Sequence, residues 1–409
     1  MGVNLRVACL MLFAASAVAG EPQRIFMTSV QGTGDLSSWP DAHGNTGLAA
    51  ADEICRTRAA DGGIAESDQY VALISDSTND AYCRWHGASG TRADNCGEAR
   101  LPTGAGPLYR MDGLASFDIA ENSMPVGDVG NIPRQIEFDE FGAPIPASEQ
   151  DGQSAAFVSS QTDGTYAGTS CADWTSSTDA DKVGLGSAYL GFGNMFGSLW
   201  TCDKSLRLLC AHTGRNGVAL AREPAPNARL AFFTEASGSG DLSTWPDAAG
   251  ATGLDAADAV CRASANRAGL ELADSYKAWL STAATNAGDR FVNDGAIYRV
   301  DGVRVAASVA QLSSALLDAP LQLNEQGTFG PFEFENVWTG TDIDGNVAPA
   351  TCNDWTSDSN SFGGEFGQSY AADSGWTTFY VPLYMGCSQP QHLYCIADND
   401  SLFLDTFDP

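Results

Sequence analysis

The chain has 409 residues, a formal net charge of −30 and a pI near 4.2. Lys and Arg number 21 against 51 Asp and Glu, and the basic residues form no cluster. Such an acidic surface repels phosphate backbones, anionic lipids and sulfated glycans, so it argues against nucleic acid and heparin-like polyanions as partners. The length predicts two or three domains, and the 44 glycines predict many turns and loops.

The N-terminus has the pattern of an export signal. Arg6 precedes an apolar run from Val7 to Val18, and small residues follow as far as Gly20. This is typical of a secretory signal peptide, which we place at residues 1–20. The run is too short to span a bilayer and no later apolar stretch is long enough, so we expect no transmembrane segment. The mature protein is expected to be secreted, whether periplasmic, extracellular or on the cell surface.

Signal cleavage leaves ten cysteines in the mature chain. An even number of cysteines in an exported protein is typical of structural disulfides. Zinc is a poor alternative, because the sequence contains no Cys-x-x-Cys pair and only four histidines.

The two halves of the mature chain are copies of one module. Residues 25–70 align without a gap on residues 231–276. Each copy begins with an apolar strand, continues through a turn with a Trp-Pro step, and enters an Ala-rich helix after a threonine cap. The helix carries a cysteine on its apolar face, and a second strand follows. We expect strands at 24–28 and 70–74 with a helix after Thr46, and strands at 230–234 and 276–280 with a helix after Thr252.

The copies diverge after the second strand. The first contains an insertion that includes residues 82–85, Cys83 and Cys96, and these two cysteines most simply pair with each other. Each copy then reaches a Cys-x-x-Trp-Thr-Ser sequence, which we name the Cys-x-x-Trp block, and ends on a strand that carries the last cysteine. The blocks are residues 171–176 and 352–357; the expected strands are 155–159, 205–210, 336–340 and 391–396, with a short helix at 309–317.

The second copy also carries Val337-Trp338-Thr339-Gly340-Thr341 before its block, then Ser374-Gly375-Trp376, Cys387 and Cys395. These landmarks resemble the C-type lectin-like fold in its compact endostatin form, as found in bacterial endostatin-like surface proteins. The resemblance covers nearly the whole mature chain. It implies an α+β protein of two tandem, disulfide-stapled domains. We place these domains at 21–213 and 228–398, with a linker at 214–227 and a tail at 399–409.

Four cysteines in each module allow three pairings. The resemblance implies one of them, in which the helix cysteine pairs with the last cysteine and the middle two pair with each other. The implied bonds are Cys55–Cys210 and Cys171–Cys202 in the first copy, and Cys261–Cys395 and Cys352–Cys387 in the second.

The loop after the Trp338 strand is the candidate metal site. In lectin-like domains the loop at this place carries sugar and calcium ligands. Here it contains Asp342, Asp344 and Asn346, whose oxygens could converge on a hard cation, so calcium is the one cofactor that we consider. A complete twelve-residue calcium loop is absent, because its last position is Asn353 rather than Glu. An Asp/Gly/Asn turn between strands is the structural alternative.

Trp355, Asp354 and Trp376 are the candidate ligand-contacting residues. Each indole has a structural alternative as a core anchor. The usual sugar-binding triplets of lectin-like domains are missing, because neither Glu-Pro-Asn nor Gln-Pro-Asp precedes the Cys-x-x-Trp block. Calcium-dependent sugar binding of the usual lectin kind is therefore not expected.

Signals for catalysis are thin. The sequence lacks a Gly-x-Ser-x-Gly elbow, a His-Glu-x-x-His motif and a phosphate-binding Gly-rich loop, and its histidines do not repeat between the copies. We therefore expect a binding protein rather than an enzyme, which recognises an extracellular protein or glycan through the loops of its two modules. The alternatives are a structural component of the envelope or matrix, and a hydrolase that uses loop carboxylates.

Overall fold

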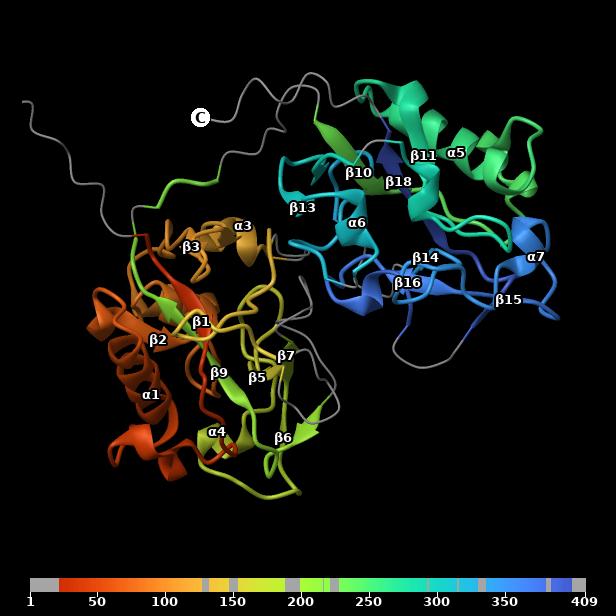
Figure 1. Ribbon diagram of the computed structural model, residues 1–409. Coiled ribbons are helices and arrows are strands. Elements are labelled where there is room, and N and C mark those ends of the chain that lie inside the picture. The colour runs from red at the N-terminus through yellow and green to blue at the C-terminus, as the bar shows by residue number, and fades with distance from the viewer. Residues whose placement is uncertain are drawn as a thin grey trace, which may run out of the picture.

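The computed structural model describes residues 22–126, 132–146, 154–187, 199–215, 217–220, 228–292, 294–314, 316–329, 336–379 and 384–398. The predicted signal peptide, the predicted tail and residues 216 and 221–227 of the predicted linker lie outside these residues. The protein is mixed α and β, and each half of the chain folds around its own sheet (Figure 1). Over the described residues, no helix combines the length and apolar character needed to cross a membrane.

The sheet of the first half is built on β9, which carries the last cysteine of this half. β9 runs antiparallel to β1 and β2 and parallel to β5, and β7 closes the sheet against β5. Among the described residues of this half, two short ribbons, β3–β4 and β6–β8, lie outside the sheet. The strands are β1 (Ile25–Met27), β2 (Tyr70–Ala72), β3 (Leu108–Tyr109), β4 (Ala115–Phe117), β5 (Ala155–Phe157), β6 (Lys182–Val183), β7 (Leu185–Ser187), β8 (Trp200–Thr201) and β9 (Arg207–His212).

The second half repeats this plan around β18. Its sheet has the order β13-β12-β10-β18-β14-β16, and β11 also pairs with β18. A separate ribbon, β15–β17, matches β6–β8 of the first half. The strands are β10 (Arg229–Phe233), β11 (Tyr276–Ala278), β12 (Ile297–Arg299), β13 (Arg304–Ala306), β14 (Asn336–Trp338), β15 (Gly363–Gly364), β16 (Phe366–Gln368), β17 (Met385–Gly386) and β18 (His392–Ala397).

One long helix packs on each sheet, α1 (Gly47–Asp61) on the first and α5 (Gly253–Arg267) on the second (Figure 1). Thr46 and Thr252 stand at the N-cap positions as expected, although neither side chain accepts a capping hydrogen bond. The expected helix at 309–317 is shorter, because it ends at Leu312. The other short helices are α2 (Ala81–Trp85), α3 (Ala120–Ser123), α4 (Cys171–Trp174), α6 (Val309–Leu312) and α7 (Cys352–Trp355), with 3-10 turns at Leu36–Ser38, Pro40–Ala42, Ser67–Gln69, Arg92–Gly97, Leu242–Thr244, Pro246–Ala248, Ala273–Ser275, Gly288–Arg290 and Ser374–Trp376.

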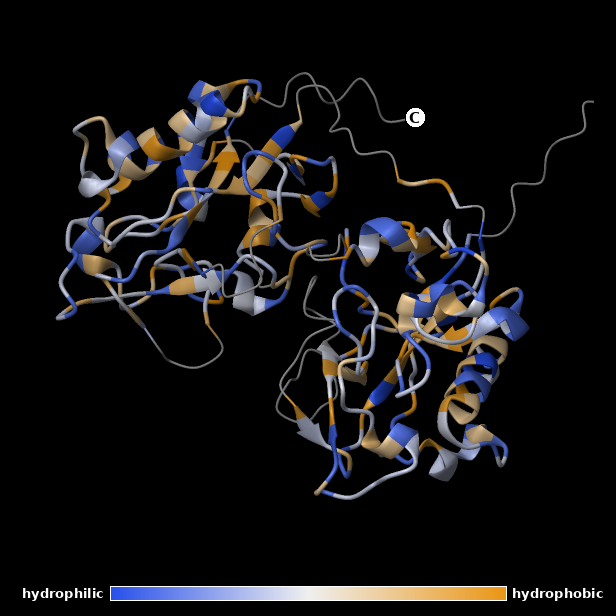
Figure 2. Ribbon diagram, turned by 180° about the vertical axis from the view of Figure 1, so that it is seen from behind, coloured by the Kyte–Doolittle hydropathy of each residue, from blue (hydrophilic) through white to orange (hydrophobic). Residues whose placement is uncertain are grey.

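Both faces of each sheet are buried. Successive side chains of a strand point to opposite faces. Phe26 therefore packs in the cluster under α1, whereas Ile25 and Met27 pack in a second cluster on the other face. In the second half, Phe232 and Phe233 divide in the same way. The middle residues of the central strands are accordingly apolar, and Figure 2 shows orange along these strands.

Among the described residues, five disulfides cross-link the chain, and each lies within one half. Cys55–Cys210 ties α1 to β9, and Cys261–Cys395 ties α5 to β18. Cys171–Cys202 and Cys352–Cys387 link each Cys-x-x-Trp block to the segment after its ribbon, and Cys83–Cys96 closes a loop in the first half. The pairing that the resemblance implied is therefore confirmed, and so is the pairing of the two extra cysteines.

The insertion in the first half begins later in the chain than the sequence predicts. Ala81 N donates to Ser75 Oγ at 2.9 Å, and Ala287 N donates to Ser281 Oγ at 2.8 Å in the second half. Residues 81–85 are therefore the counterpart of 287–291, and the extra residues come after Trp85. The prediction that residues 82–85 belong to the insertion was wrong because the two segments share so few residue types.

The two halves touch through equivalent segments. Gln135 Nε2 donates to the carbonyl of Leu317 at 3.1 Å, and Gln322 Nε2 donates to the carbonyl of Ile132 at 2.8 Å. Ile132 and Leu317 occupy matching positions, each six residues before a carbonyl that accepts from the first strand of its half. The described start of the predicted linker packs on the first half, where Leu220 N donates to Asp118 Oδ1 at 2.8 Å.

Candidate ligand-binding site

The Cys-x-x-Trp block forms a left-handed turn in both halves. The φ angles of Cys352, Asn353, Asp354 and Trp355 are 48°, 56°, 56° and 64°. The matching residues 171–174 also have positive φ throughout. A left-handed conformation costs an L-residue about 1–2 kcal/mol, so a run of such residues persists only where the surrounding contacts hold it.

Three kinds of contact hold the turn. Trp355 is fully buried and its Nε1 donates to the carbonyl of Ser281 at 2.7 Å. Asp354 accepts a hydrogen bond from Ala283 N at 2.8 Å, which ties the turn to the segment after β11. The disulfide of Cys352 fixes the other side. The first half repeats all three contacts, with Trp174, Asp173 and Cys171 in the matching roles.

The turn carboxylate is held in its ionised form. Burial opposes ionisation of Asp173, but hydrogen bonds from Ser77 and Ser170 outweigh it and keep the pKa of this carboxyl below its usual value. Ser77 N donates to Asp173 Oδ1 at 2.9 Å and Ser77 Oγ donates to Oδ2 at 2.6 Å. The carboxylate therefore acts as a fixed acceptor that closes the turn.

The burial of Trp355 and Trp376 and the hydrogen bonds of Asp354 decide whether these three candidates can contact a ligand. Trp355 and Trp376 have no exposed surface, and Trp376 packs against Trp279 with ring centroids 5.2 Å apart. Indoles so deeply buried cannot contact a ligand in this conformation, so their structural alternative as core anchors holds. The carboxylate of Asp354 accepts from Ala283 N and from Thr351 Oγ1. Its carboxylate therefore stabilises the left-handed turn.

The candidate calcium loop forms a tight turn. Asp342 Oδ1 accepts from Asp344 N at 3.0 Å and from Asn346 N at 2.9 Å. This is the backbone arrangement that an Asp/Gly/Asn turn adopts. In the part of the chain that the structure describes, no three His, Cys, Asp or Glu residues gather closely enough to hold a metal ion. Calcium binding by Asp342, Asp344 and Asn346 stays a prediction.

A two-stranded ribbon beside each turn presents apolar side chains to solvent. In the second half, Phe362 and Tyr384 on the β15–β17 ribbon are 48% and 42% exposed. A Cβ at Gly363 would lie only 2.7 Å from the Cβ of Tyr384, so the glycine makes room for the tyrosine beside it. In the first half, Leu199 on the β6–β8 ribbon is 61% exposed. The pairing of Val183 with Trp200 and of Gly364 with Met385 makes Leu199 the counterpart of Tyr384.

Sequence reasoning missed these ribbon residues. Leu199 and Tyr384 each stand three residues before a cysteine of the inner disulfide, at Cys202 and Cys387. That shared spacing is the signal that could have found them. It could not show their exposure, because apolar residues in an otherwise apolar half are first assigned to the core.

No protein-family model matches the chain, and no curated protein is significantly similar to it.

Proposed function

We propose that the protein is an exported binding protein built from two lectin-like modules of the endostatin type. Its ligand is an extracellular protein or glycan, which it recognises through the loops around the β6–β8 and β15–β17 ribbons. One observation carries this proposal: both halves expose large apolar side chains at the same place on the ribbon. Exposed apolar side chains that recur at matching positions indicate a contact surface.

The ribbons are well suited to binding because they are held in place before a ligand arrives. Cys202 follows β8 and Cys387 follows β17, and each is bonded to the left-handed turn of its own half. A rigid aromatic side chain on a fixed ribbon loses little conformational freedom on binding, so more of its contact energy appears as affinity. Tyr384 and Trp200 belong to the residue types that most often dominate binding energy.

The two ribbons offer different side chains. The second half exposes two aromatic side chains, Phe362 and Tyr384, whereas the first exposes Leu199 beside the partly buried Trp200. Two linked surfaces raise the overall affinity for a ligand that reaches both. The difference between them favours two ligands, or two parts of one ligand, over a repeated identical contact.

Two buried carboxylates have structural roles that need no catalytic explanation. Glu140 accepts from Ser29 N at 2.8 Å, and its counterpart Glu325 accepts from Glu235 N at 2.7 Å. Both therefore fix the turn that follows the first strand of their half. Burial raises the pKa of Glu325. Such a carboxyl is explained by its structural bond and need not be assigned to acid–base chemistry.

Arrays of matrix proteins and glycans, probed with the mature protein with and without calcium, test the proposal. A ligand found there should bind at least roughly tenfold more weakly to the double variant Phe362→Ser/Tyr384→Ser, or to Leu199→Ser, according to the half that it contacts. Val292→Ser is the matched control, because Val292 is exposed on the second half away from the ribbon. It should bind like the wild type.

Two results would replace this function by an alternative. If no protein or glycan binds above background and deletion of the protein weakens the cell envelope, the structural role is the better explanation. If the protein turns over a glycan or peptide and loses that turnover when one loop carboxylate is changed, it is a hydrolase.

A further inference from the structure

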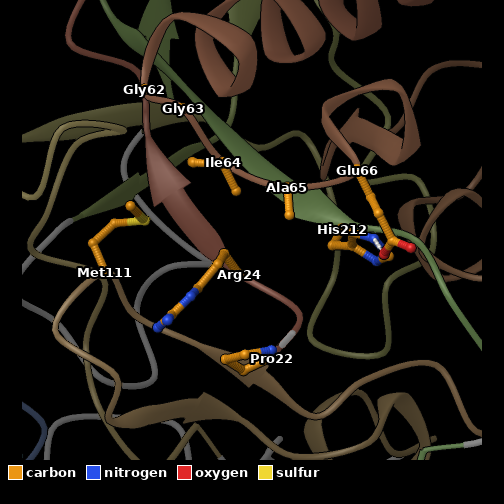
Figure 3. A pocket seen from close by; sticks show the side chains of 9 residues that line it. All are labelled: Pro22, Arg24, Gly62, Gly63, Ile64, Ala65, Glu66, Met111 and His212. Carbon is orange, nitrogen blue, oxygen red and sulfur yellow. Dashed lines mark hydrogen bonds and ion pairs between the residues drawn. The ribbon is translucent and has the colours of Figure 1, made fainter. Parts of the chain in front are cut away.

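The first half contains a cavity that neither the ribbon nor the left-handed turn explains. Its volume is about 310 Å³, and it lies where β1 begins and β9 ends, beside the residues that follow α1. Arg24, Glu66 and His212 supply its charged and polar side chains, and Ile64 and Met111 supply apolar walls. Figure 3 shows Arg24 and Met111 toward one end of the cavity and the Glu66–His212 pair toward the other.

His212 is the most informative residue in the cavity. It is only 7% exposed, and its ring packs edge-on against Tyr70 at 5.4 Å. Its Nε2 lies 3.0 Å from Glu66 Oε2. An ionised carboxylate can only accept, so Nε2 donates to Glu66; in the tautomer that carries its one proton there, Nδ1 has a lone pair. Among the described residues, Nδ1 has no hydrogen-bond partner. A buried nitrogen of this kind calls for a donor from a ligand or solvent.

Arg24 supplies donors at the other end. Its Nη1 donates to the carbonyl of Arg110 at 2.8 Å, which orients the guanidinium. A guanidinium has five N–H donors, so this bond leaves others for a ligand. The cavity therefore offers donors on Arg24 and, once its wall moves enough to uncover the buried atom, an acceptor on His212 Nδ1, with apolar surface between them.

The second half is an internal control for these side chains. Ile25 pairs with Ala211 and Ala231 pairs with Ile396, so Arg24 corresponds to Leu230 and His212 to Ala397. Glu66 corresponds to Leu272, which has nearly the same positive φ at the same point of the chain. All three positions are thus apolar in the second half, where Leu230 and Ala397 pack into the core. The fold does not require the polar set, so its presence in the first half calls for a function.

We propose that this cavity binds a neutral polyhydroxylated molecule, such as a monosaccharide unit or a polyol. A hydroxyl is both donor and acceptor, so one hydroxyl can donate to His212 Nδ1 while another accepts from Arg24. Ile64 and Met111 would contact the C–H groups of the same molecule. Arg24 and Glu66 offset each other in charge, and the net charge of −30 disfavours anions. The volume lies at the lower end of the roughly 300–1,000 Å³ usual for small-molecule sites.

Saturation-transfer NMR on the mature protein tests the proposal. The probes are glucose, galactose, mannose, N-acetylglucosamine and sorbitol, with acetate and methylammonium as charged competitors. We expect at least one sugar or polyol to bind. The triple variant Arg24→Leu/Glu66→Leu/His212→Ala, which carries the residues of the second half, should bind it at least roughly tenfold more weakly. Circular dichroism and thermal unfolding establish that this variant is folded.

Should the triple variant fail to fold, Glu66→Leu gives a second test, because the exposed Glu66 holds the proton of His212 on Nε2, so its loss should weaken sugar binding by removing the fixed acceptor on Nδ1 without disturbing the core. Three results would overturn the proposal: no binding of any of these sugars or sorbitol, equal binding by wild type and variant, or displacement of the sugar by acetate or methylammonium. The site is independent of the ribbons. The variant Phe362→Ser/Tyr384→Ser should keep the sugar signal, so the two proposals can fail separately.

Discussion

Ala172 and Asn353 are residues whose contribution to stability is set by their backbone conformation. Both stand at the second position of the left-handed turn, with φ of 51° and 56°. A glycine has no Cβ and adopts this conformation without the penalty that alanine has. Whether a substitution by glycine raises or lowers the free energy of unfolding therefore reports the backbone conformation at that position.

Ala172→Gly should stabilise the protein by about 1 kcal/mol. The matched control is Ala60→Gly, because Ala60 is also exposed but lies in the right-handed helix α1. That change should destabilise the protein by about 0.5–1 kcal/mol. Urea unfolding of both variants measures the two signs. A destabilising Ala172→Gly would show that the turn is not left-handed.

His86 predicts a loss of stability in acid. It is buried, its Nδ1 lies 2.8 Å from the carbonyl of Tyr82, and its Nε2 accepts from Ala105 N at 3.4 Å. Burial lowers the pKa of His86, and this effect outweighs the bond to Tyr82 and the nearby carboxylate of Glu121, which raise it. The folded protein thus resists a proton that the unfolded chain accepts near pH 6.5. The stability from a neutral His86 is complete above about pH 6.5 and is lost as the pH falls below that value.

His86→Gln removes the titrating group and keeps a side chain that can donate to Tyr82. The free energy of unfolding should therefore fall less steeply between about pH 7.5 and about pH 5 in the variant than in the wild type. Urea titrations at both pH values provide the comparison. Parallel pH dependence in the two proteins would mean that His86 does not contribute to acid lability.

At the scale of elements, each long helix is joined to its sheet by the same polar brace. Asp258 on α5 accepts from Ala278 N at 2.9 Å, and Arg290 donates to Asp258 at 2.7 Å and also to the carbonyl of Ala278. In the first half, Asp52 likewise accepts from Ala72 N, and Arg84 donates to Asp52 and to the carbonyl of Ala72. The brace thus satisfies both backbone groups of the last residue of β2 or β11, where a second strand partner is missing on that side.

Asp258→Ala should cost about 3–5 kcal/mol of stability, because it leaves Arg290 nearly buried without its carboxylate. Asp247→Ala is the control, since the Asp247–Arg267 ion pair lies on the surface and should be worth about 0–1 kcal/mol. Chemical denaturation of both variants gives the difference. Similar costs for the two would show that the brace is not a buried ion pair.

For the whole molecule, the contact between the halves decides whether they behave as one unit. Gln135 and Gln322 are both buried, and each donates to a carbonyl of the opposite half. Arg134 lies in the same region, and burial, together with Arg110 and Arg299, lowers its pKa to about 10. A contact that holds several polar groups away from water is stable only while its hydrogen bonds are kept.

Gln135→Met/Gln322→Met removes both reciprocal bonds while nearly keeping the side-chain volume. Each carbonyl left without a partner should cost about 1–3 kcal/mol, and the two halves should then unfold separately. Scanning calorimetry should show two transitions in the variant where the wild type shows one. Gln326→Met, at an exposed position of the second half, is the control and should unfold like the wild type. A single transition in the double variant would show that these bonds do not couple the halves.

The sequence by itself determined the features that depend on local pattern. The duplication, the long helices with their buried cysteines and the central apolar strands were all predicted, because residue spacing reports which side chains share a face. The cysteine pairing followed from a resemblance and is confirmed. The extent of the insertion was misjudged, because Arg84 and Arg290 match only through their contacts.

Only the tertiary structure decided what depends on residues far apart in the chain. Four successive left-handed residues are unfavourable locally. They persist because three contacts hold the turn: a buried indole, a disulfide, and a backbone N–H from the segment that follows β2 or β11. Leu199 and Tyr384 are exposed because they lie on a two-stranded ribbon, whose strands pair within the loop that the inner disulfide of each half closes. Arg24, Glu66 and His212 share a cavity because β1 pairs with β9, and such long-range pairing leaves no local mark in the sequence.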